Sequence, residues 1–193
     1  AQFARLFGHR VKHLNLNSVT TKVDALVGLL GACPNLESLY CNAMSPRFWA
    51  PLDSADNWQS LTVVDAKSAL GIPRAMRKDL RVLALWQASG VREHDVRQLV
   101  GAATEELYLS CSPLVGDGVV RALAQRHAQL RTMVLRSVRS LTPTVVHAAL
   151  EAAAATLRVL DLSGSLPGYQ VFPPGTPLAS LECLISDDNN VDL

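Results

Sequence analysis

The sequence has no strong charge of either sign and no long hydrophobic run. Its 193 residues include 18 basic and 17 acidic side chains, for a net charge of +1, and 49% of the residues are hydrophobic. A chain this apolar and this weakly charged can bury enough surface to fold, which excludes an intrinsically disordered protein. No stretch reaches the roughly 18 consecutive apolar residues of a membrane-spanning helix, so we expect no membrane insertion.

Cysteine is sparse, and its spacing is not that of a metal site or a disulfide framework. The four cysteines lie far apart and form no Cys-x-x-Cys pair. We expect reduced thiols, with Cys41 and Cys183 buried at positions where a repeat described below has leucine. Reduced thiols and the lack of a secretory signal indicate an intracellular, cytoplasmic protein. Because the chain starts at Ala1 rather than methionine, organellar import and a preceding domain stay open as alternatives.

Signatures of catalysis are also missing. The sequence contains neither a Gly-x-Ser-x-Gly nucleophile turn nor a glycine-rich phosphate loop. His9 and His13 are close in sequence, but His13 belongs to an expected strand, where their spacing does not repeat the one-face geometry of a helix. The other three histidines lie in separate expected helices. We therefore predict a protein that is not an enzyme, with no catalytic residues, no metal and no cofactor.

What the sequence does contain is a phrase, Leu-x-x-Leu-x-Leu or a close relative, that recurs at nearly uniform spacing. The phrases begin at Val11, Leu36, Leu61, Leu80, Thr104, Leu130, Leu157 and Leu178. Their average spacing falls within the period of roughly 20 to 29 residues that is typical of leucine-rich repeats, in which each unit buries its apolar edge against the next. The pattern predicts one α/β domain over residues 1–193. We expect a curved leucine-rich-repeat solenoid of about eight repeats, with a parallel β-sheet on the concave face and helices and loops on the convex face.

Helical patterns follow four of the phrases. Thr142 as N-cap and Pro143 as first helical residue begin one helix, and Asp117 is placed to cap another. Two more helices are expected through residues 23–30 and 91–100. Proline and glycine predict irregular return segments near residues 45–59 and 164–177. The two shortest intervals, from Leu61 to Leu80 and from Leu157 to Leu178, are expected to mark departures from regularity.

Two segments resemble one subclass of these repeats. The run Cys-Pro-Asn-Leu-Glu-Ser-Leu, from Cys33 to Leu39, is similar to the junction of the cysteine-containing repeats in F-box leucine-rich-repeat proteins. The strand, cysteine and aspartate-capped helix expected over residues 107–124 follow the order of that subclass. Where other subclasses have a ladder of asparagines, this sequence has Ser112, Val138 and Ser165. The resemblance implies a module that recognises other proteins, without the separate helical F-box.

The positions between and just after the leucines predict a binding face, because successive side chains of a strand point to opposite sides of a sheet. These positions hold large side chains, Tyr40, Trp86, Tyr108 and Arg136, and the apolar side chains of Val63, Val82 and Val134 are expected between them. Tyrosine, tryptophan and arginine are enriched where proteins bind each other most strongly. The sequence thus predicts noncatalytic recognition of a protein partner, as a subunit of a larger assembly or as a substrate-receptor-like module. The alternative for the aromatic residues is that they only cover neighbouring backbone.

Arginines in the C-terminal half keep a second function open. A basic surface formed by several of them would bind structured RNA or a ribonucleoprotein. Carboxylates are interspersed among them, which favours a mixed, solvated surface instead. The arginines concerned are Arg121, Arg126, Arg131, Arg136, Arg139 and Arg158.

Overall fold

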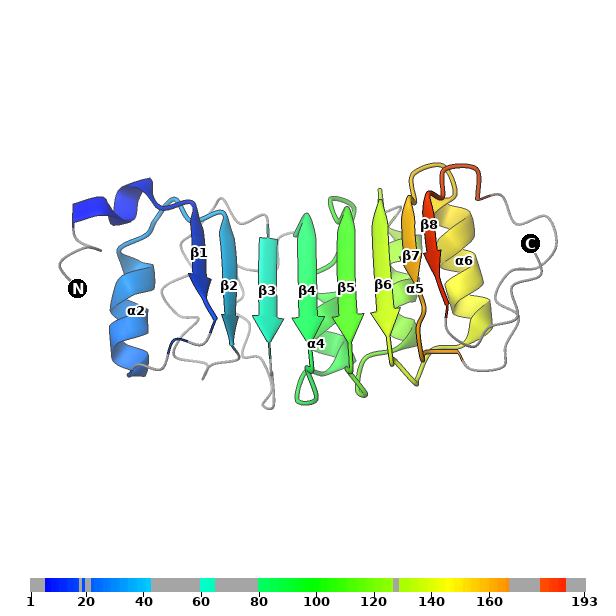
Figure 1. The fold of residues 1–193 in the computed structure, drawn as a ribbon, viewed down its shortest axis with the longest axis horizontal. Coiled ribbons are helices and arrows are strands. Elements are labelled where there is room, and N and C mark those ends of the chain that lie inside the picture. The colour runs from blue at the N-terminus through cyan, green and yellow to red at the C-terminus, as the bar shows by residue number, and fades with distance from the viewer. Residues whose placement is uncertain are drawn as a thin grey trace.

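The fold is one open, parallel β-sheet with helices on one side. The computed structural model describes residues 6–17, 19, 22–42, 60–64, 80–126, 129–166 and 178–186. In these residues, eight parallel strands follow one another across the sheet in chain order, and there are four α-helices (Figure 1). Each strand pairs only with its neighbours in sequence, so the molecule is elongated. The arrangement is α/β and solenoid-like.

Every predicted phrase contains or adjoins a strand, and the four expected helices are present. The strands are β1 His13–Leu16, β2 Ser38–Asn42, β3 Ser60–Val64, β4 Val82–Trp86, β5 Glu106–Ser110, β6 Thr132–Arg136, β7 Val159–Asp161 and β8 Cys183–Ile185. The helices are α2 Val23–Gly31, α4 Glu93–Arg97, α5 Asp117–Gln125 and α6 Pro143–Ala153, and a 3-10 turn over Gly8–Arg10 precedes β1. In the described part, no helix is long and apolar enough to cross a membrane.

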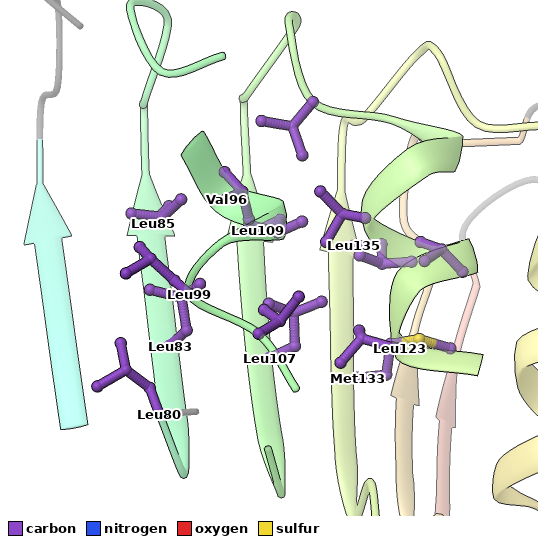
Figure 2. Packing of buried hydrophobic residues seen from close by; sticks show 14 of the residues in the cluster. Leu80, Leu83, Leu85, Val96, Leu99, Leu107, Leu109, Leu123, Met133 and Leu135 are labelled. Atoms are coloured by element: carbon purple, nitrogen blue, oxygen red, sulfur yellow. The ribbon is translucent and has the colours of Figure 1, made fainter. Parts of the chain in front are cut away.

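The leucines of the phrase form the core between the sheet and the helices. Figure 2 shows Leu83 of β4 and Leu107 of β5 on the same side of the sheet as Val96 of α4 and Leu123 of α5. All four side chains are at most 1% exposed. Burying one such side chain contributes about 1.5–3 kcal/mol. The core therefore runs the length of the sheet, because each repeat adds its leucines to those of the next.

The pairing of β3 corrects the third predicted phrase. Leu61 pairs with Leu39, the second leucine of the preceding repeat, so Leu61 is not the first residue of its phrase. Val63 pairs with Cys41 on one side and Leu85 on the other. Both of these neighbours have fully buried side chains. Val63 is thus in the row of core positions, not in the open row that the sequence predicted for it.

The pairing of β8 corrects the eighth phrase in the same way. Leu184 pairs with Leu160, so the phrase begins at Leu181 rather than at Leu178. Cys183 becomes the partner of Val159 and is exposed, so the prediction that it is buried is wrong.

These two corrections remove the short intervals that the sequence predicted. Both intervals came from a wrong phrase start, at Leu61 in one case and at Leu178 in the other. In the sheet, Leu61 takes its place in one row between Leu39 and Leu83, and the strands before and after it are in continuous register. The array is therefore more regular than the sequence indicated.

Each strand from β4 to β7 ends in a similar tight turn. The residue at corresponding positions has a positive φ of 54° at Gln87, 51° at Cys111, 51° at Ser137 and 66° at Gly164. Left-handed backbone of this kind costs energy in residues other than glycine, so the surrounding structure must hold it. Backbone hydrogen bonds to the next repeat hold this conformation. For example, the amide of Cys111 donates to the carbonyl of Arg136 at 3.0 Å.

Serine occupies a buried position directly after one of these turns. The Ser165 side chain is 2% exposed, and its hydroxyl donates to the carbonyl oxygen of Leu135. The amide of Val138 donates to the same Ser165 oxygen at 2.9 Å. Unpaired backbone groups are costly when buried, and this serine satisfies two of them in the preceding repeat.

The predicted start of α6 is correct, the predicted start of α5 is displaced by one residue, and neither predicted side-chain cap forms. Thr142 is the N-cap of α6 and Pro143 is its first residue, yet the Thr142 side chain makes no capping bond. The N-cap of α5 is Gly116 rather than Asp117. The side chains of Thr142 and Asp117 are instead bonded to each other between repeats. The irregular segment predicted at 45–59 lies outside the described residues, and of the segment at 164–177 only the turn at residues 164–166 is described.

Candidate binding surface

The candidate site is on the face of the sheet that is turned away from α4 and α5, here called the open face (Figure 1). Strand pairing arranges its side chains in rows with one residue from each strand. One row contains Ala84, Tyr108, Val134, Asp161 and Ile185, and the row beside it contains Trp86, Ser110 and Arg136. The term open-face patch is used below for Trp86, Tyr108, Val134, Arg136 and Asp161.

Two aromatic rings form one end of the open-face patch. Trp86 and Tyr108 stack with a centroid separation of 6.3 Å and an interplanar angle of 28°. They come from neighbouring strands, where Tyr108 pairs with Ala84 and Trp86 pairs with Ser110. Ala84 is only 5% exposed, so its small side chain is covered. Both rings are half-buried, which holds them in place and leaves part of their area free for contact.

Glu106 fixes the polar end of the aromatic pair. The Tyr108 hydroxyl donates a 2.7 Å hydrogen bond to Oε2 of Glu106, two residues earlier on the same strand. The pKa of Tyr108 is raised to about 12, first by burial and then by the hydrogen bond and negative charge of the Glu106 carboxylate, against an opposing contribution from Thr132. The phenol is therefore neutral and oriented at neutral pH.

An ion pair forms the other end of the patch. Nε of Arg136 donates to Oδ2 of Asp161 at 2.5 Å, and the amide and hydroxyl of Ser163 donate to Oδ1 at 3.0 and 2.5 Å. Asp161 is 1% exposed, whereas the Arg136 side chain is 46% exposed. Burial alone would raise the pKa of Asp161, but the bonds from Ser163 and Arg136 outweigh it and hold that pKa below its ordinary value. Asp161 is thus an ionised carboxylate beneath the surface that orients an exposed guanidinium.

The structure brings together four of the seven predicted contact residues. Trp86, Tyr108, Val134 and Arg136 all belong to the open-face patch. Val134 is only 7% exposed, so it forms the floor of the patch rather than a projecting contact. Val82 is half-buried on the open face in the row of Glu106, at the edge of the patch.

The remaining two predicted residues do not join the patch. Tyr40 is half-buried on β2, and the whole of β3 separates it from β4 and Trp86. Val63 aligns with the core positions described above. Asp161 and Glu106 were not among the predicted contact residues, although both bond to residues of the patch. A carboxylate at an open-face position, near a large polar or aromatic residue, is the sequence feature that could have indicated them. Identifying which residue each carboxylate bonds to required the strand register.

Several arginines of the C-terminal half bond to carboxylates or backbone carbonyls of the chain itself. Arg131 pairs with Glu105 at 3.7 Å and Arg158 with Glu182 at 3.2 Å. The Arg126 guanidinium donates to the carbonyl oxygens of the preceding repeat. Arg131 and Arg158 lie just before the strands β6 and β7, Arg136 lies on the open face, and Arg126 lies at the end of α5. These side chains therefore do not form one basic surface.

None of the four thiols is in a disulfide. The four cysteines are free, with Cys41 fully buried as predicted. Among the residues that the structure describes, no three His, Cys, Asp or Glu side chains gather in a way that could hold a metal ion.

Comparison of the chain with protein-family models and with curated proteins finds no match.

Proposed function

We propose that this chain is a noncatalytic protein-recognition module of the leucine-rich-repeat type, which binds a protein partner on its open face. The observation that carries the proposal is the open-face patch, in which a stacked Trp86 and Tyr108 lie near the oriented Arg136 on neighbouring strands of one sheet. No described element covers this patch. The resemblance of residues 33–39 to the repeats of F-box proteins adds support for a receptor-like role.

The composition of the patch suits tight protein binding. Trp, Tyr and Arg side chains contribute the most when they are central to an interface, and truncating one of them costs about 2 kcal/mol or more. Stacking and the bonds to Glu106 and Asp161 already restrict these side chains in the free protein. A partner therefore has less side-chain entropy to remove on binding.

The test is partner capture with a Trp86→Ala/Tyr108→Ala variant. Native chain and variant are used for affinity purification, with proximity labelling as a second method, and the captured proteins are identified and compared. A control variant, Arg121→Ala/Gln125→Ala, changes two exposed residues of α5 on the opposite side. We expect the native chain and the control to capture the same partner and the patch variant to lose it. Circular dichroism and thermal unfolding verify that all three are folded.

Equal capture of the same partner by the folded patch variant would contradict the proposal. Whether the native chain purifies alone or only with its partner distinguishes the two versions of the proposal, an assembly subunit and a receptor-like module. A chain that is obtained only together with its partner is a subunit of a larger assembly. A stable monomer that binds its partner reversibly is a receptor-like module.

A further inference from the structure

A polar cavity opens beside Arg136, where strands of the open face end. Its volume is about 390 Å³, and it is lined by Ser110, Arg136, Ser137, Ser163, Gly164 and Ile185. Arg136 is the one charged side chain in this lining. Two of its lining residues, Arg136 and Ser110, stand in the same row of the sheet as Trp86, because Arg136 pairs with Ser110 and Ser110 pairs with Trp86.

The bond to Asp161 leaves the outer part of the Arg136 guanidinium available. Nε of Arg136 donates to Asp161, and no acceptor in the described part of the chain engages either terminal nitrogen. The carboxylate of Asp161 cannot reach out to compete for a ligand, because its two oxygens are bonded to Arg136 and Ser163 and its side chain is 1% exposed. The result is a guanidinium fixed from behind, with two parallel N–H donors of the geometry that binds a carboxylate.

The backbone turns shape the wall of the cavity. Ser137 and Gly164 both have positive φ, and the amide of Ser137 donates to the carbonyl of Ser163 at 2.8 Å. A Cβ atom at Gly164 would lie 3.1 Å from the Ser137 hydroxyl oxygen. Glycine at this position therefore leaves free space beside the Ser137 hydroxyl, and both residues line the cavity with Arg136.

We infer that this cavity binds the carboxylate of an aspartate or glutamate side chain of the partner protein. The terminal nitrogens of Arg136 hold the carboxylate, and the hydroxyls of Ser110 and Ser137 donate to it. This inference rests on the proposed function and names the chemistry that the partner must present. A single guanidinium that shares its charge with Asp161 fits a carboxylate, whereas recognition of a phosphate group uses clusters of arginine.

The register also predicts where the partner's apolar anchor lies. Trp86 and Arg136 are on β4 and β6, and two strand spacings correspond to about 10 Å. An extended peptide rises roughly 3.3 Å per residue. A partner segment that crosses the strands should thus have an aromatic or aliphatic residue about three positions from its acidic residue.

The first step of the test is selection from a phage-displayed library of random peptides on the full chain. We expect enriched peptides to contain an acidic residue and an apolar residue at about that spacing. One enriched peptide is synthesised with its acidic residue, with Gln in place of Glu or Asn in place of Asp, and with phosphoserine at that position. Fluorescence polarisation gives the Kd of each peptide for each protein variant.

The protein variant is Arg136→Gln/Asp161→Asn, which removes the ion pair without leaving a buried carboxylate unpaired. We expect it to bind the acidic peptide at least about tenfold more weakly than the native chain does. The amide peptide should bind both proteins with similar Kd, so that the two changes are strongly non-additive. The control Arg121→Ala should bind the acidic peptide like the native chain, and thermal unfolding verifies that each variant is folded.

Equal binding of the acidic peptide by the native chain and the Arg136→Gln/Asp161→Asn variant would overturn the inference. Tighter binding of the phosphoserine peptide than of the acidic peptide would overturn it in favour of a phosphate site. In either case, peptides that still require Trp86 and Tyr108 leave the proposed function intact. Peptides that bind the Trp86→Ala/Tyr108→Ala variant unchanged count against the proposed function itself.

Discussion

The carboxylate of Asp117 holds Thr142 in the next repeat through two hydrogen bonds. The amide of Thr142 donates to Oδ1 and its hydroxyl donates to Oδ2, each at 2.7 Å. Asp117 begins α5 and Thr142 precedes α6, so these bonds connect the starts of two neighbouring helices. In a solenoid, stability comes from the repeats and from the interfaces between neighbours, and this pair belongs to such an interface.

Replacing Asp117 by alanine should therefore destabilise the protein. We expect a loss of about 1–2 kcal/mol, because a charged acceptor of two hydrogen bonds is removed near the surface. Urea unfolding followed by circular dichroism measures the change. Asp24→Ala is the control, since Asp24 is an exposed acid in the first turn of α2. Similar losses in the two variants would show that the contact between repeats contributes nothing beyond a helix-end charge.

Acid should weaken the fold partly through Asp161. Its pKa is lower in the folded protein than its ordinary value, so the unfolded chain takes up the proton first as the pH falls. The contribution is present above the unfolded-state pKa and is lost as the pH falls through the folded-state pKa. As the pH falls from about 6 to about 3, the free energy of unfolding should decrease less in Arg136→Gln/Asp161→Asn than in the native chain. Parallel curves for the two proteins would refute this assignment.

Alkaline pH should lower the free energy of unfolding partly through Tyr108. Its pKa is raised to about 12, so an unfolded tyrosine near its ordinary value of about 10 releases its proton before the folded one does. The stability that Tyr108 contributes is present below about pH 10 and is lost as the pH rises toward 12. The absorbance of tyrosinate during an alkaline titration should show a late ionisation step in the native chain, and Tyr108→Phe should lack that step. An unchanged late step in that variant would assign the raised pKa to another tyrosine.

The sequence was sufficient to predict much of the fold. Buried leucines such as Leu83 and Leu107 recur at the predicted strand positions, and the pattern through Val145 and Val146 correctly predicts α6. These predictions succeed because hydrophobic spacing directly reflects which side of a strand or helix is buried. The candidate site was predicted in part, since Trp86, Tyr108 and Arg136 do lie on the open face.

Asp161 shows why the rest of the site required the structure. Its partner Arg136 belongs to the preceding repeat and becomes a neighbour only when β6 and β7 pair. The capping expectation for Asp117 failed for the same reason, because the carboxylate found Thr142 in the next repeat. Local sequence rules identify a side chain that can accept a hydrogen bond, but they do not contain the competing donors that folding brings close.

The sequence by itself determined the repeat period, the parallel strands and the buried leucines, because these follow from the spacing of apolar residues along one chain. Only the tertiary structure decided the register of β3 and β8, and with it the row in which Val63 stands and the exposure of Cys183. Both predicted phrases were displaced by an odd number of positions. Side chains alternate along a strand with a period of two, so an odd displacement assigns every residue to the opposite face. Where several apolar residues fit the phrase equally well, hydrogen bonding to the neighbouring strand selects which of them occupy the core positions.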